Sequence, residues 1–460
     1  MSFWFQNGGC SNKRQTTLMS RLKKCFGAGG YITLCALAAV AQAQDQSAPG
    51  AIVRFDISQR FEYSDNPDLA DPKVSESRAI TTFGVGVTSD TQVSRFRFDM
   101  RSNLEAGATR ETGLSSPVLT LGYDRDVGHS RLGSALSFQD AAVNSDSTST
   151  VFDPGSIKKL GVDLEVETGA DAPFGTSWTL FHDSQRYSGT TDPSLIDNTT
   201  DGITGQLLFR FDPRVTGRLT GKYVDYDIKG TGTDRRTTGI GAGLEVQLDK
   251  LWQADLSLSR DKVRLTGLSN RTEEGLSVGL RLNREMARGM LSLDLASDVG
   301  ENGRRDSAIL RRKVDLPLGA LTVSGGATQT DGLGSNPLYG LDYTRELPRG
   351  TFSISLEQSV ETDTTTQEEI NSSLRISHTA AINSTSRLRS SASVYDSNEL
   401  GSGADDSRRV DLSLTYERDL TADWDLISGL SHRRSTSDSA TDRSSNTVYV
   451  GLKRSFDWIP

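Results

Sequence analysis

Alternation of apolar and polar residues with a period of two is the feature that most restricts how this chain can fold. From position 53 to position 63, every second residue except residue 59 is apolar or aromatic: Val53, Phe55, Ile57, Phe61 and Tyr63. Polar or charged residues lie between them. Successive side chains of a β-strand point to opposite faces, so this pattern predicts a strand with one apolar and one polar face. More than ten alternating residues exceed an ordinary half-buried strand, but they suit an inclined strand that crosses a membrane.

The same alternation returns along the rest of the chain, and no stretch with a helical period interrupts it. It is clear in the segments 96–104, 160–166, 203–211, 276–282, 410–416 and 448–452. A hydrophobic content of only 35% and a mean hydropathy of −0.43 do not conflict with membrane insertion, because only alternate residues of a barrel strand face lipid. After the first 43 residues, no run of roughly 18 apolar residues occurs, which excludes a helical membrane protein.

Short and long polar connections alternate between these segments. Short ones include 127–129, 212–214 and 347–349, and longer ones include 64–77, 141–156, 189–201 and 435–444. Bacterial outer-membrane barrels show this asymmetry between short periplasmic turns and long extracellular loops. We therefore expect an all-β, antiparallel, up-and-down transmembrane barrel of about 22 strands, with no plug domain. The segment 289–332 is weakly patterned, so the expected range is 18–22 strands.

A soluble β-propeller or β-sandwich is the alternative fold, since either has many strands and polar loops. Its strands would be shorter, and charged residues would not balance a buried face over ten or more positions. The barrel is therefore the favoured interpretation.

The first 43 residues have the features of an N-terminal extension and a cleaved signal peptide. A basic start after Met19 is followed by an apolar run from Cys25 to Val40 and by the small-residue site Ala41-Gln42-Ala43. Met19 is an alternative start, and a lipoprotein signal at Cys35 is an alternative to cleavage after Ala43. Residues 44–460 are then one outer-membrane barrel without cysteine.

The expected mature chain is strongly acidic. The leader removes five of the 51 basic residues and none of the 60 acidic ones, which leaves 46 against 60 and a net charge of −14. This balance does not favour nucleic acid as a partner.

The C-terminal segment ends in an amphipathic pattern with terminal aromatics. Val448, Val450, Leu452, Phe456 and Trp458 alternate, although Arg454 breaks the series and two residues follow Trp458. The segment resembles the signal that the barrel-assembly machinery recognises. We therefore expect that machinery, outer-membrane lipid and lipopolysaccharide as partners, and a location in the outer membrane of a Gram-negative cell.

No enzyme motif is found: the sequence lacks a P-loop, HExxH and G-x-S-x-G. The histidines are scattered, at positions 129, 182, 378 and 432. We expect no enzymatic activity, no cofactor and no metal site. Asp65, Asp68 and Asp71 in the first long segment could bind a divalent cation or simply form a solvated acidic loop.

Charged residues on the polar faces of three strands suggest a polarised lumen. A basic stripe is expected from Arg54, Arg60, Arg95, Arg97 and Arg101, and an acidic patch from Asp163, Glu165 and Glu167. Opposite charges across a pore would produce a transverse field that orients polar or anionic solutes. Ordinary solvated residues are the alternative explanation.

The exit of the first strand, Phe61-Glu62-Tyr63-Ser64-Asp65-Asn66-Pro67-Asp68-Leu69, resembles the opening of the putative β-barrel porin-2 family. The resemblance implies an outer-membrane channel and, through family members associated with exopolysaccharide export, possible passage of polysaccharide. It carries over no catalytic residue.

Two functions follow as hypotheses. The first is a porin-like channel for export or passage of polysaccharide or other polar solutes. The second is a structural or surface-interaction barrel with an occluded lumen and ligand-binding extracellular loops.

Overall fold

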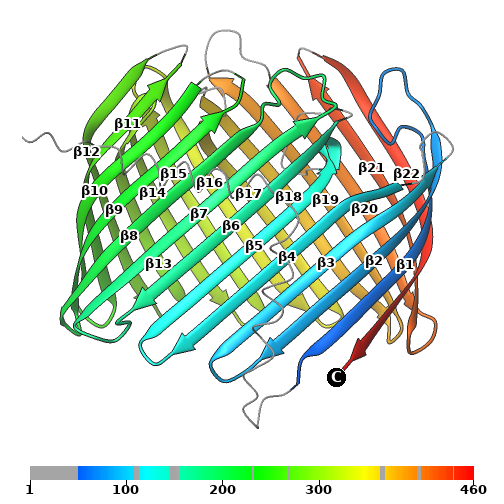
Figure 1. Cartoon of the computed structure of the whole chain (residues 1–460), viewed down its shortest axis with the longest axis horizontal. Coiled ribbons are helices and arrows are strands. Elements are labelled where there is room, and N and C mark those ends of the chain that lie inside the picture. The colour runs from blue at the N-terminus through cyan, green and yellow to red at the C-terminus, as the bar shows by residue number, and fades with distance from the viewer. Residues whose placement is uncertain are drawn as a thin grey trace, which may run out of the picture. The chain divides into compact units, whose positions relative to one another are not determined.

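The computed structural model describes residues 50–107, 113–145, 153, 155–230, 233–267, 270–362, 368–400, 406–438 and 440–459. The expected leader, with its cysteines and cleavage site, lies outside these residues. The described chain forms one antiparallel sheet of 22 strands (Figure 1). The strands are β1 (Ile52–Ser64), β2 (Glu76–Asp90), β3 (Ser94–Gly107), β4 (Gly113–Val127), β5 (Ser130–Ala142), β6 (Ser156–Thr168), β7 (Phe174–Ser188), β8 (Asn198–Asp212), β9 (Val215–Ile228), β10 (Thr233–Gln247), β11 (Trp252–Thr266), β12 (Arg271–Met286), β13 (Gly289–Gly300), β14 (Gly303–Leu316), β15 (Gly319–Thr330), β16 (Gly334–Leu347), β17 (Gly350–Thr362), β18 (Glu368–Asn383), β19 (Ser386–Leu400), β20 (Asp406–Asp419), β21 (Trp424–Ser437) and β22 (Ala440–Trp458).

The sheet closes on itself. Each strand pairs with its neighbours in sequence, and β1 also pairs with β22, from Val53 opposite Trp458 to Ser64 opposite Thr447. Closure removes the two free edges that an open sheet would expose. The sequence-based expectation of an all-β antiparallel barrel of about 22 strands is thus confirmed.

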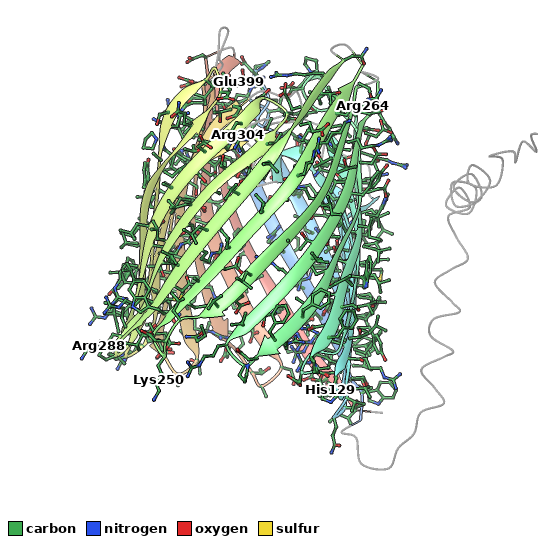
Figure 2. All side chains as sticks on the ribbon, turned by 90° about the vertical axis from the view of Figure 1, so that its left-hand side faces the viewer. His129, Lys250, Arg264, Arg288, Arg304 and Glu399 are labelled. Atoms are coloured by element: carbon green, nitrogen blue, oxygen red, sulfur yellow. The ribbon has the colours of Figure 1, made fainter. Side chains whose placement is uncertain are left out.

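The two ends of the barrel differ in their connections. Those that follow even-numbered strands are short and define the turn end, where His129, Lys250 and Arg288 lie (Figure 2). Connections that follow odd-numbered strands define the loop end, where Arg264, Arg304 and Glu399 lie (Figure 2). In the described part of the chain, no helix is long and apolar enough to cross a membrane.

The wall has one apolar and one polar face, as period-two patterning requires. One row of facing residues across β2–β6 is apolar and consists of Val87, Phe98, Leu121, Leu136 and Val162. The adjacent row belongs to the opposite face and contains Thr88, Arg97, Gly122, Ala135 and Asp163. The register carries this division around all 22 strands to the β1–β22 seam without a conflict.

Contacts across the barrel identify the polar face as the inner one. Arg409 on β20 and Arg433 on β21 both donate hydrogen bonds to the backbone oxygen of Asn144, in the connection between β5 and β6. Around the wall, β20 and β21 lie seven and six places from β5, so the two arginines can meet that connection only through the interior.

Buried apolar side chains collect at the loop end of the interior. Leu69 and Val143, in the β1–β2 and β5–β6 connections, are buried with Ile80, Ala141 and Ile157 on the inner wall. On the other side of the barrel, Tyr226, Ile228, Val263 and Leu265 are buried near the ends of β9 and β11. The remaining interior surface is mostly polar, so the small apolar core lies under the loops.

Two regions differ from, or clarify, the expected connections. The weakly patterned segment 289–332 contains the whole of β13, β14 and β15, and only residues 301–302 join β13 to β14 at the loop end. With short connections at both ends, this region lacks the short–long alternation that is clear from β1 to β8. The expected long loop at 435–444 is wrong, because β21 continues to Ser437 and β22 begins at Ala440.

Candidate functional site

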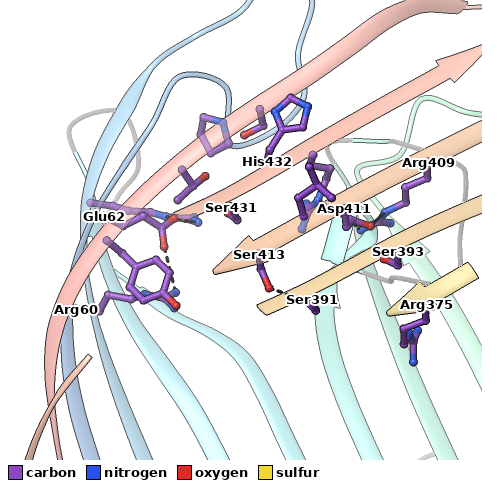
Figure 3. Close-up of a pocket in the computed structure, with 17 residues that line it drawn as sticks. Arg60, Glu62, Arg375, Ser391, Ser393, Arg409, Asp411, Ser413, Ser431 and His432 are labelled. Carbon is purple, nitrogen blue, oxygen red and sulfur yellow. Dashed lines mark hydrogen bonds and ion pairs between the residues drawn. The ribbon is translucent and has the colours of Figure 1, made fainter. Parts of the chain in front are cut away.

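A cavity of about 540 Å³ opens on the inner wall near the loop end, among β18–β22, β1 and β2. Its charged lining consists of five arginines and two carboxylates: Arg60, Arg78, Arg375, Arg409, Arg433, Glu62 and Asp411 (Figure 3). Serine and threonine side chains fill most of the space between them. Positive charge therefore exceeds negative charge in a hydroxyl-rich pocket.

Glu62 is the buried anchor of one side of the cavity. It accepts hydrogen bonds from Nε and Nη2 of Arg78 at 2.8 and 2.5 Å, and Arg60 approaches it at 3.2 Å. Glu62 and Arg78 are direct cross-strand partners on β1 and β2, so the register itself brings them together. Paired in this way, the carboxylate fixes both guanidinium groups at the cavity wall.

Asp411 organises the other side. It lies 2.6 Å from Nε of Arg409 and 2.9 Å from Nε of Arg433. Arg409 is 1% exposed, and a buried charge of this kind needs the carboxylate and carbonyl acceptors that it has here. The two arginines then reach the backbone oxygen of Asn144 at 3.3 and 3.0 Å.

Arg375 differs from the other arginines of the cavity. It is exposed on β18 and forms no ion pair with any residue in the described part of the chain. Its cross-strand partners are Ser355 and Ser393. Its guanidinium group is therefore available to an anionic ligand.

Connections between strands form a roof beside the cavity. The side chain of Asn144 donates to the backbone oxygen of Asp68 at 2.9 Å and accepts from the backbone N–H of Asp153 at 2.8 Å. Asp153 in turn accepts hydrogen bonds from the backbone N–H groups of Gly155, Thr191 and Asp192. Burial opposes ionisation of Asp153, but these N–H groups hold its pKa below the ordinary value. The β1–β2, β5–β6 and β7–β8 connections are thus joined to one another.

The segment 61–69, which carried the family resemblance, closes the β1–β22 seam at the loop end. Asp65 accepts from the backbone N–H of Asn446 at 2.6 Å and from its side-chain amide at 2.8 Å. Burial opposes ionisation, yet these bonds and Lys73 keep the pKa of Asp65 below its ordinary value. Asn66 bonds to Ser444 and to both backbone groups of Ala70. Among the described residues, no acidic or histidine cluster has the arrangement of a metal site.

The five arginines of the predicted basic stripe all lie on the inner face, but acidic residues alternate with them. Arg54 pairs with Asp457 at 2.8 Å, Arg95 with Asp90 at 3.1 Å and Arg60 with Glu62. Arg97 and Arg101 form no ion pair within the described ranges.

Two glycines on β2 explain the closeness of acidic groups to this stripe. Gly84 and Gly86 lie between the inward residues of β1 and β3, and a Cβ atom at Gly86 would be 3.0 Å from Oδ1 of Asp99. The side chains of Asp56 and Asp99 occupy the space that larger residues on β2 would take.

The acidic residues Asp163, Glu165 and Glu167 also lie on the inner face, on β6. Their cross-strand partners on β5 are Ala135, Gly133 and Arg131. They form no ion pair within the described ranges. Only β4 and β5 separate them from Arg95, Arg97 and Arg101 on β3, so they lie on the same side of the barrel as the arginines and not across the pore from them.

The C-terminal strand shows why Arg454 interrupts its apolar pattern. Phe456 stacks on Phe55 across the seam, with ring centroids 5.2 Å apart. Arg454 lies on the same outer face near the turn end, above the rings of Trp424 and Phe456 and 3.5 Å from Asp423. Its long stem covers aromatic surface while its charge reaches the turn. Val448, Val450, Leu452 and Trp458 are exposed on this face as well.

Two charged residues of the cavity were named from the sequence, Arg60 in the predicted basic stripe and Glu62 in the segment 61–69, whereas the other charged residues of its lining were not singled out. Arg375, Arg409 and Arg433 have the parity opposite to neighbouring apolar residues, so alternation alone could have placed them inside. Their convergence depends on the register across the four strands β18–β21 and on the β5–β6 connection, which alternation does not reveal.

Comparisons with known proteins bear on the fold alone. No protein-family model and no curated protein sequence matches the chain. Among solved structures, it is similar to the FrpB iron transporter from Neisseria meningitidis, with a TM-score of 0.57, 9% identity and coverage of 88% of this chain and 81% of that one. It is also similar to a mutant ferric enterobactin receptor PfeA from Pseudomonas aeruginosa in complex with enterobactin, with a TM-score of 0.55, 11% identity and coverage of 89% of this chain and 82% of that one. For the siderophore receptor PirA from Acinetobacter baumannii, the TM-score is 0.53 and the identity 9%, with coverage of 88% of this chain and 80% of that one. The chain therefore has the barrel fold of these iron transporters and siderophore receptors.

Proposed function

We propose that this protein is a porin-like channel of the outer membrane, which passes polar solutes and is suited to polysaccharide. The observation that carries the proposal is the sorting of side chains on a closed wall. Outward rows such as Val87–Phe98–Leu121 are apolar, whereas the facing interior carries arginines, carboxylates and hydroxyls. Such a wall satisfies its backbone within the sheet and offers lipid an apolar exterior and solutes a wet interior.

The size of the barrel supports a water-filled lumen. Barrel diameter grows with strand number, and barrels of 16–18 strands already leave an aqueous channel. Residues Ile52 to Trp458 belong to the 22 strands or to their connections. We propose that no separate plug domain fills this wall, that residues 1–43 serve as an extension and signal peptide, and that the loop end faces the cell exterior.

The proposed location defines the partners. The apolar outer face would contact outer-membrane lipid and lipopolysaccharide, and the C-terminal strand would be recognised by the barrel-assembly machinery. The inner charges act on solutes: Arg97 and Arg101 on β3 form no ion pair within the described residues, and Asp163, Glu165 and Glu167 lie three strands further along the wall, on β6. The resemblance of segment 61–69 to the porin-2 family agrees with a channel, although here that segment contributes to the seam.

Single-channel recording tests the proposal. The refolded barrel in a planar bilayer should give discrete, ohmic current steps, and the denatured protein at the same concentration should give none. A correctly folded barrel that gives no steps over a wide range of voltage and salt would contradict the channel function.

An occluded barrel whose loops bind a ligand is a second candidate, supported by the roof. Asn144 connects the β5–β6 connection to Asp68, Asp153, Arg409 and Arg433 across the interior. If the roof closes the lumen, Asn144→Ala should open it and produce current steps that the unmodified barrel lacks. Similar conductance with and without the substitution would argue for a lumen that is already open.

A further inference from the structure

A continuous row of hydroxyl side chains crosses the inner wall. Each of eight neighbouring strands, from β16 to β22 and then β1, contributes one member that faces the next across the sheet. In spatial order these are Thr344, Ser353, Ser377, Ser391, Ser413, Ser431, Thr447 and Ser64. Neither a charged nor an apolar residue interrupts this hydroxyl row.

The hydroxyl row climbs the wall from one end of the barrel to the other. Thr344 lies three residues before the last residue of β16, at the turn end, whereas Ser64 is the last residue of β1, at the loop end. Strands of a closed barrel are inclined, so a row perpendicular to them winds upward. Seven steps of about 4.8 Å between neighbouring strands, at a tilt of roughly 40°, give a climb of about 22 Å, close to the apolar height of a membrane barrel.

Several hydroxyls of the row form hydrogen bonds with one another and can still form further hydrogen bonds. The hydroxyl oxygens of Ser353 and Ser377 are 2.6 Å apart, and those of Ser391 and Ser413 are 2.7 Å apart. Figure 3 shows the second pair at the edge of the cavity. A hydroxyl has one donor and two acceptor lone pairs, so a pair that shares one proton can still donate and accept.

The cavity lies directly on this path. Ser391, Ser413, Ser431 and Thr447 belong both to the hydroxyl row and to the cavity lining. Arg375 is in the next row of the wall, between Ser355 and Ser393, and extends from the same face. A ligand that follows the hydroxyls therefore passes an exposed guanidinium group.

We propose that the hydroxyl row is a contact track for an extended, acidic glycan and that Arg375 binds its carboxylates; this inference rests on the proposed channel function. Serine hydroxyls both donate and accept, as sugar hydroxyls do. Neighbouring strands place them about 4.8 Å apart, which is close to the length of one sugar unit in an extended chain. Each bond exchanges with water and adds little net affinity, so the chain can move from site to site.

Current block by defined oligomers tests the track. The probes are hexagalacturonate, which carries carboxylates, and maltohexaose, which is neutral. The track variant combines Ser391→Ala, Ser413→Ala and Ser431→Ala. The matched control replaces three inward serines outside the row, Ser137, Ser257 and Ser307, by alanine. Heat-dependent mobility on gels verifies that each variant is folded.

In the unmodified barrel, both hexamers should interrupt the current, and the acidic one for longer. The track variant should shorten both residence times about tenfold, whereas the control variant should leave them unchanged. Arg375→Gln should shorten the hexagalacturonate residence at least about tenfold and leave maltohexaose unaffected. Equal residence times in the track and control variants, or no block by either hexamer, would overturn the track. An equal loss for both hexamers in Arg375→Gln would overturn its carboxylate role.

Failure of the channel function is distinguishable from failure of the track. If the folded, unmodified barrel gives no current, the channel proposal is wrong. Equilibrium binding of fluorescent hexamers to the refolded barrel then tests the row, with the same variants. Weaker binding in the track variant alone would support the row, and equal binding in both variants would reject it.

Discussion

Arginine substitutions at two adjacent positions of β4 test the assignment of the wall's two faces. Leu121 lies on the outer face, opposite Phe98 on β3 and Leu136 on β5, whereas its neighbour Thr120 lies on the inner face. The positions differ by one residue in depth and both carry uncharged side chains. Leu121→Arg and Thr120→Arg therefore differ mainly in whether the new charge meets lipid or water.

The depth of Leu121 sets the size of the effect. It lies six residues before Val127, the last residue of β4 at the turn end. With about 3.4 Å per residue and a tilt of roughly 40°, it lies about 16 Å from that end, near the middle of an apolar band about 25 Å tall. Arginine at such a depth costs about 2–4 kcal/mol, which lowers the folding equilibrium constant by roughly 30- to 900-fold. Thr120→Arg, in a wet interior, should change stability by about 0.5 kcal/mol or less.

Reversible folding into lipid vesicles, followed by denaturant titration, measures both values. The same samples can be scored by heat-dependent mobility on gels. Equal loss of stability in the two variants, or a greater loss for Thr120→Arg, would refute the assigned faces and the register that produced them.

Three further predictions follow from named contacts. Replacing Arg97 and Arg101 together by Gln should shift the reversal potential of the channel toward cation selectivity without loss of folding, and an unchanged reversal potential would show that these charges do not control permeation. Asp153 has a lowered pKa in the folded protein, so its contribution is complete above about pH 4 and is lost as the pH falls through that lowered value. Hydrogen exchange of amides in the β7–β8 connection, corrected for intrinsic rate, should lose protection at acid pH in the unmodified protein, whereas Asp153→Asn should already have lost it at neutral pH. Phe456→Ala should destabilise the β1–β22 seam by about 0.5–1.5 kcal/mol through lost stacking, measurable as a lower denaturation midpoint in lipid.

Local patterning was enough to predict the barrel because the alternation within each strand indicates which side chains face outward and which face inward. The alternation around Phe55 and Phe98 depends only on the period of a strand, so no distant contact is needed to read it. Strand boundaries in the segment 289–332 were harder to predict because its strands are joined by short connections at both ends of the barrel. The predicted loop at 435–444 was too long because polar residues there continue β21 and β22. Polar composition does not distinguish a loop from the part of a strand that rises above an apolar band.

The hydroxyl row and the cavity illustrate what one strand cannot reveal. Ser391 and Ser413 are ordinary inward serines in their own strands, and they become neighbours only through the register of β19 and β20. A shift of one residue in that register would turn one of them outward. The pairing of Asn144 with Arg433 depends further on the path of a connection, which no periodicity encodes.

The unequal connections at the loop end give the barrel an uneven rim. On one side, residues 65–75 and 189–197 take part in the joined roof, while β13–β14 and β15–β16 are linked only by 301–302 and 331–333. A peptide inserted at 331–333 would therefore extend a connection that supports no roof, and lengthening a loop costs only about 0.6 kcal/mol for each doubling. The same insertion at 189–197 would pull apart the hydrogen bonds that Asp153 receives. The low side of the rim is thus the place where an epitope or affinity tag can be displayed without disturbing the interior.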